Sequence, residues 1–133
     1  MGVWGPESFA NDEALDWLCD LIDEDDPFFV HNTLDIIVDY PGDEPPEAWD
    51  CSCALAAAEM VAAAKGKPPP EFPKAANVWL ERHNIEIDPQ LLTSALKAVE
   101  RVRTNSELQQ VWDDSPEKDS WYKSLADLIN RLN

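Results

Sequence analysis

Apolar residues recur every three to four positions along most of this 133-residue chain, which is the spacing of amphipathic helices. With residues placed about 100° apart, one face of segment 12–24 is apolar and the opposite face carries aspartates. The apolar face holds Ala14, Trp17, Leu18, Leu21 and Ile22. Similar stripes occur in 89–103 and in 121–132. The pattern predicts helices whose apolar faces meet in a core.

Capping residues and prolines mark the ends of about six helical segments. Asn11 is a good N-cap for the first helix, which we expect to end near Glu24. A capping side chain followed by proline recurs at Asp26-Pro27, Asp88-Pro89 and Ser115-Pro116. Thr104 and Glu107 have the spacing of a capping box. We therefore expect helices to begin at each of these places.

The middle of the chain predicts two further helices with a proline-rich loop between them. A helix over 46–65 should stop at Gly66, because the prolines that follow cannot continue it. The loop is expected near 66–73, and a short helix over 74–83 should follow. Residues 85–87 are expected to be extended before the next helix begins.

Residues 28–40, FFVHNTLDIIVDY, are the ambiguous segment, because β-branched and aromatic residues also suit a strand. The Asp-Pro start and the lack of partner strands favour a helix. We thus expect an all-α fold, a compact single-domain bundle of about six helices, with residues 1–133 forming one acidic helical domain.

Seven of the eleven residues from Ala54 to Ala64 are alanine, so we expect this helix at the centre of the bundle, where small side chains let neighbours approach closely. Glu59 interrupts the run. Charged residues are mostly exposed, and exposure is the favoured prediction for Glu59. If it is buried instead, it needs a base as partner. The candidate bases are Arg82, Arg101 and Arg103.

Charge is distributed unevenly along the chain. Residues 1–64 hold 16 Asp and Glu and no Lys or Arg, which is a net charge of −16, whereas residues 65–133 are nearly neutral at −1. A surface of one sign repels nucleic acid and anionic membranes and attracts basic proteins. A solubility surface without a partner is the alternative explanation.

Neither a secretory signal nor an apolar run long enough to span a membrane is present. The three cysteines are an odd number, which suits a reduced cytosol better than a disulfide framework. We therefore expect a cytoplasmic protein that does not bind membranes.

The sequence carries no catalytic signature. Its four glycines form no phosphate-binding loop, and it contains neither HExxH nor GxSxG. Cys51 and Cys53 lack two further ligands at zinc-site spacing, and Asp23–Asp26 lacks the glycine of a calcium loop. His31 and His83 are expected to be ordinary helix-surface residues. We predict no catalytic residue, no metal site and no cofactor, and hence no enzyme.

Several motifs follow one another along the chain: Gly2-x-Trp4-Gly5, Phe9-x-Asn11-Asp12-x-Ala14-x-Asp16-Trp17, the AAAEMVAAA run, Asn105-Ser106-Glu107-Leu108 with Trp112, and Trp121-x-x-x-Leu125-x-x-Leu128. Their order resembles that of the bacterial domain-of-unknown-function 4259 family of small acidic proteins. The resemblance implies a bacterial cytosolic protein and brings no accepted activity or catalytic residue. Small acidic bacterial proteins of this type are often immunity proteins that neutralise a toxin.

The leading hypothesis is therefore an acidic inhibitor, an immunity protein that neutralises a basic toxin such as a nuclease. The acids expected to bind the partner have no structural role that the sequence reveals. Trp49, which lies outside any apolar stripe, is the expected aromatic anchor. The acids are Asp12, Asp16, Asp20, Asp23, Glu24, Asp25, Asp26, Asp39, Asp43, Glu44 and Glu47. We expect a monomer, since a face of this charge resists self-association.

Two other functions remain open. The carboxylates could mimic DNA phosphates and inhibit a DNA-binding protein, in which case DNA would compete for the same partner. Alternatively, the chain could be an enzyme or a small-molecule-binding domain with a pocket in which a carboxylate lies beside tryptophan. The tryptophans considered are Trp4, Trp17, Trp79 and Trp112.

Overall fold

A computed structural model describes residues 5–133, and this part of the chain contains seven helices and no strand. The helices are α1 (Asp12–Glu24), α2 (Phe28–Val38), α3 (Ala48–Ala64), α4 (Lys74–Arg82), α5 (Pro89–Thr104), α6 (Glu107–Asp113) and α7 (Lys118–Leu132). The all-α prediction is confirmed, with one helix more than about six. Residues 28–38 are helical, and 85–87 are an irregular link without strand pairing. Trp4 lies outside the described residues.

Two of the predicted helix starts are confirmed to the residue. The side chain of Asn11 accepts a hydrogen bond from the backbone N–H of Ala14 at 2.8 Å. Asp88 accepts one from Leu91 at 2.7 Å, with Pro89 as the first helical residue. These side chains occupy backbone donors that have no partner within the helix.

At the other two capping-plus-proline sites the helix begins later than predicted. Asp26 accepts from the N–H of Phe28 at 3.0 Å, and α2 starts after Pro27. Ser115 accepts from the N–H of Glu117 at 3.1 Å, and α7 starts only at Lys118. In both places the side chain closes a short turn that precedes the helix.

The predicted capping box at Thr104 is wrong. Thr104 is the last residue of α5, and Ser106 is the N-cap of α6, accepting from the N–H of Gln109 at 3.0 Å. The hydroxyl of Ser106 also donates to the carbonyl of Val102 at 2.6 Å. Ser106 therefore satisfies both helix ends at the corner between α5 and α6, a double role that Thr104 does not have.

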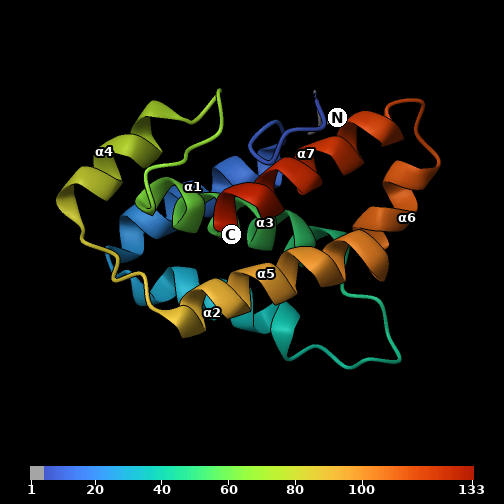
Figure 1. Cartoon of the computed structure of the whole chain (residues 1–133), viewed down its shortest axis with the longest axis horizontal. Helices are drawn as coiled ribbons and strands as arrows, with labels where there is room; N and C mark the ends of the chain where they lie inside the picture. The colour runs from blue at the N-terminus through green and yellow to red at the C-terminus, as the bar shows by residue number, and fades with distance from the viewer. Residues whose placement is uncertain (1–4) are drawn as a thin grey trace.

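Helix α3 lies at the centre of the bundle, as predicted, and every residue from 51 to 62 is buried. It packs against α1, α2, α5, α6 and α7, and Figure 1 shows it enclosed by them. Alanines make this possible, because a helix with small side chains on all sides can be approached closely from every direction.

The core follows the predicted stripes closely. In α1 four of the five predicted residues are buried, and Ile22, at the edge of the stripe, is 40% exposed. The stripes of α5 and α7 are buried throughout, apart from the partly buried Ile129. Trp121 of α7 stacks on Trp112 of α6 with ring centroids 6.0 Å apart.

The proline-rich loop is confirmed between α3 and α4. Gly66 adopts a positive φ of 90°, which ends α3 in the left-handed conformation that glycine reaches without strain. Farther along, Phe72 packs edge-on against Phe9 with centroids 5.9 Å apart, so the loop covers the segment before α1. Among residues 5–133, no helix has the length and apolar character needed to cross a bilayer.

Candidate functional site

The eleven acids expected to bind a partner are all exposed. They lie on the outer face of α1, in the link from α1 to α2, and in the loop 39–47. The acids of α1 are exposed because the opposite face of this helix packs inward. On that face Trp17 is buried and donates its indole N–H to Thr33 Oγ1 at 2.8 Å. That contact sets the rotation of α1, so Asp16 and Asp20 must face solvent.

The loop 39–47 is held chiefly by Arg101 of α5. The side chain of Asn105 also donates to the carbonyl of Gly42 at 3.4 Å, and the N–H of Glu107 donates to that of Pro46 at 2.9 Å. The guanidinium of Arg101 donates to the carbonyl oxygens of Tyr40 at 3.2 Å, Pro41 at 2.8 Å and Glu44. It also lies 6.0 Å from the centre of the Tyr40 ring. A planar group with several donors is suited to gathering carbonyls in this way. The acids of the loop therefore have a defined position, although the loop has no regular structure.

Besides burial, Asp50 near the start of α3 raises the pKa of both Cys53 and Tyr40. Burial raises the pKa of Cys53 to about 12, and nearby carboxylates add to this effect. Those carboxylates are Asp50, Glu13, Asp20 and Asp16. The pKa of Tyr40 is also raised, first by desolvation and then by Glu47, Glu44, Asp50 and Glu107. Asp50 therefore acts on one group that the α1 acids also affect and on another that the loop acids also affect.

Two of the eleven acids do have structural roles, contrary to the sequence-based expectation. Asp25 ends α1 in the left-handed conformation, with φ at 55°, and its carboxylate lies 2.7 Å from Nε2 of His83. Asp26 holds the start of α2. His83 is not an ordinary surface residue either, because its ring stacks on Trp79 with centroids 4.3 Å apart. This pair ties the end of α4 to the end of α1.

Four large apolar side chains are exposed near these acids, and one of them is Ile22 of α1, which adjoins Asp23 and is 40% exposed. Trp49, at the start of α3, is 53% exposed and adjoins Asp50 in the chain. Phe28 and Ile36 of α2 are 67% and 50% exposed, and sequence analysis did not single them out. The available signal was the composition of α2, in which apolar residues occur on every side of the helix.

The prediction that Glu59 is exposed is wrong, since it is 1% exposed. Its predicted partners are wrong too. Arg131 of α7 donates to both carboxylate oxygens, at 2.7 and 3.3 Å, and Ser8 donates at 2.8 Å. Burial alone would lower the pKa of Arg131, but Glu59 and Asp127 raise it. Neither Ser8 nor Arg131 has a local sequence signal, because folding brings them together from both ends of the chain.

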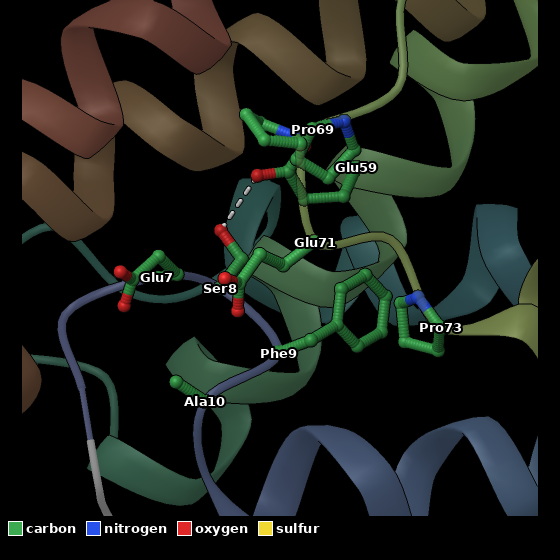
Figure 2. Close-up of a pocket in the computed structure, with 9 residues that line it drawn as sticks. Glu7, Ser8, Phe9, Ala10, Glu59, Pro69, Glu71 and Pro73 are labelled. Atoms are coloured by element: carbon green, nitrogen blue, oxygen red, sulfur yellow. Dashed lines mark hydrogen bonds between the residues drawn. The ribbon is translucent and has the colours of Figure 1, made fainter.

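A cavity of about 390 Å³ borders Glu59. Figure 2 shows the Ser8–Glu59 hydrogen bond on one side of it and Phe9 facing Pro73 on another. The proline-rich loop closes the cavity with Pro69 and Pro70. The cavity thus combines a buried carboxylate with an apolar wall, and the side chains lining it include no histidine or cysteine that could act as a base or a nucleophile.

The buried thiols are poorly suited to chemistry at neutral pH. Burial raises the pKa of Cys51 to about 11 and that of Cys53 to about 12, so both stay protonated. Within residues 5–133, no group of three or more His, Cys, Asp or Glu side chains is placed to hold a metal ion.

The family model described as "Domain of unknown function (DUF4259)" matches residues 2–124, and the chain belongs to that family. No curated protein matches the chain, and no solved structure matches it.

Proposed function

We propose that this chain, a member of the DUF4259 family, binds and inhibits a basic protein partner, and that it is a bacterial immunity protein for a toxin such as a nuclease. One observation carries the proposal. All eleven acids of the expected surface are exposed, and within residues 5–133 only Asp25 among them forms an ion pair. Residues 1–64 contain no Lys or Arg to neutralise the others.

A surface of this kind suits a nuclease target for an electrostatic reason. The active cleft of a nuclease must be positive to hold phosphates, and a fixed array of carboxylates can occupy or cover it. Charge mainly increases the association rate and the specificity, while affinity depends on a few buried anchors. Trp49 is the proposed anchor, because it is exposed beside the acids of α3 and the loop.

The test uses a partner that is isolated from the native host or encoded by a neighbouring gene. Its affinity for the full chain is measured at two salt concentrations. We expect the dissociation constant to rise at least about tenfold between about 50 and 300 mM NaCl. Replacing Asp16, Asp20 and Asp23 with asparagine should slow association. The matched control changes three exposed acids on the other half of the chain to amides: Asp114, Glu117 and Asp119.

Equal effects of the two triple variants would contradict a specific role for the α1 surface, and salt-independent affinity would contradict the electrostatic mechanism. Competition with duplex DNA distinguishes binding at the DNA-binding cleft of the partner from binding elsewhere on the partner. A partner displaced by duplex DNA would favour DNA mimicry or coverage of an active cleft, whereas a ternary complex would indicate binding away from the cleft.

A second candidate, small-molecule binding, is supported by one hollow between α1 and α4. It has a volume of about 680 Å³ and is lined by Trp79, Asp23 and Asp25 among others. The indole N–H of Trp79 is buried and has no hydrogen-bond partner. Quenching of tryptophan fluorescence by a small-molecule library, compared between the native chain and Trp79→Phe, tests this candidate. Identical responses would exclude it.

A further inference from the structure

Helix α2 carries apolar side chains on both its buried and its exposed side. Its inner face packs against α3 and α5. The buried residues are Val30, Thr33, Leu34 and Ile37. On the outside, Phe28 is 67% exposed and Ile36 is 50% exposed. A surface helix normally presents polar residues to water, so these two exposed apolar side chains depart from the usual pattern. The ring of Phe28 lies against that of His31, with centroids 5.4 Å apart.

The outer residues form a strip along the helix in which the polar Asn32 lies between Phe28 and Ile36. Phe28, Asn32 and Ile36 are four residues apart and follow one side of α2, so the strip is about 12 Å long. Asp35 and Asp39 lie next to it, and both are exposed. The helix contains no Lys or Arg. A strip with an apolar side chain at each end and acidic neighbours is therefore presented to solvent.

A groove runs beside this strip, between α2 and the segment that leads into α5. Its volume is about 500 Å³. Phe28, Ile85 and Leu91 supply apolar surface, and carboxylates come from Asp35, Glu86 and Asp88. None of the lining residues is Lys or Arg. The groove would thus hold an apolar side chain together with a positive charge, and it would disfavour an anion.

We propose that the outer face of α2 and this groove form the docking surface for a basic segment of the partner, one that carries Lys or Arg beside an apolar side chain. This inference rests on the proposed function and gives it a location. The aliphatic stem of Lys or Arg can lie on Phe28 while its charge faces Asp35 and Glu86. The α1 acids then attract the partner, and α2 provides the desolvated contact.

Two synthetic peptides of equal length and charge test the proposal on the full chain. One is an amphipathic helix of leucine and lysine, and in the other serine replaces leucine. We expect the leucine peptide to bind at least about tenfold more tightly, and the double variant Phe28→Ser/Ile36→Ser to remove that advantage. Val111→Ser is the matched control, because Val111 is 59% exposed on α6. Fluorescence anisotropy measures the affinities, and circular dichroism checks the fold.

The outcomes separate this inference from the proposed function. If the double variant binds both peptides as the native chain does, the α2 surface is not the docking site, although salt-sensitive binding of the serine peptide would still support an acidic binding protein. Binding of neither peptide would contradict both proposals. If the native chain sediments as a dimer that the double variant dissociates, the face pairs with a second copy, and a basic partner is excluded there.

Discussion

Glu59 places a carboxylate inside an alanine-rich helix that other helices enclose. Such a group is tolerated only when its charge and its acceptor sites are matched, since an unpaired buried charge costs several kcal/mol. Arg131 supplies the charge and two hydrogen bonds, and Ser8 supplies a third. Because Ser8 precedes α1 and Arg131 is near the end of α7, the carboxylate connects both ends of the chain to the central helix.

Arg131→Ala should therefore lower the free energy of unfolding by about 3 kcal/mol or more, because it leaves Glu59 buried with only Ser8 as a partner. Arg103→Ala is the control. It removes an ion pair with Glu100 whose side chains are 38% and 52% exposed, and it should cost at most about 1 kcal/mol. Urea unfolding measures both. Equal losses would mean that burial of the Glu59 pair has little energetic weight.

The buried thiol of Cys51 predicts a loss of stability at high pH. Its pKa is raised to about 11 in the folded chain, chiefly by burial, so the unfolded chain releases this proton at lower pH. The contribution is fully present below about pH 9 and is lost as the pH rises towards about 11. Between about pH 8 and 10, the native chain should lose about 1 kcal/mol more than Cys51→Ala. Parallel pH profiles of the two proteins would contradict this.

Among the elements, the loop 39–47 depends on α5 for its shape. The loop has no helix or strand of its own, and Arg101 binds three of its carbonyl groups. A lysine at this position would keep the charge but could not reach several carbonyls in one plane. The position of the loop acids is therefore a property of the contact between these two elements.

Arg101→Lys should make the loop several-fold more sensitive to a glutamate-specific protease, which cleaves after Glu47 but not at the Glu44–Pro45 bond, because hydrogen bonds to a charged group contribute about 1.5–3 kcal/mol each. Arg103, two residues along the same helix, contacts Glu100 and not the loop, so Arg103→Lys serves as the control. Limited proteolysis followed by mass spectrometry gives the cleavage rates. Similar rates for both variants would show that Arg101 does not hold the loop.

For the whole molecule, the charge distribution opposes compactness. The net charge is −17, and nearly all of it belongs to residues 1–64. Carboxylates of α1 and Asp50 act together on Cys53, and carboxylates of the loop and Asp50 act together on Tyr40, so within each set they also repel one another. Repulsion of this kind destabilises the folded state and is screened by salt.

Thermal stability should therefore increase with salt. We expect the melting temperature to rise by about 3 °C or more between about 20 and 300 mM NaCl. The variant with Asp16, Asp20 and Asp23 changed to asparagine should melt higher at low salt and respond less to added salt. Changing Asp114, Glu117 and Asp119 to amides should have a smaller effect, because bases balance that half of the chain. A melting temperature that falls with salt would contradict net repulsion.

The sequence alone determined the helices, the central position of α3 and most of the core. These follow from local causes: apolar spacing, capping at Asn11 and Asp88, and alanine in α3. The exposure of the acids also followed, because they lie opposite the apolar stripes. Such features depend on residues within one or two helical turns of one another, and the sequence shows those neighbours directly.

Only the tertiary structure decided which distant groups meet. Glu59 with Ser8 and Arg131, Asp25 with His83, and the groove beside α2 each join segments that are far apart in the chain. The sequence offered several bases for Glu59, and each choice was compatible with local periodicity. Helix packing selected Arg131 because α7 lies against α3, and the rotation of α7 brings this side chain to the buried carboxylate.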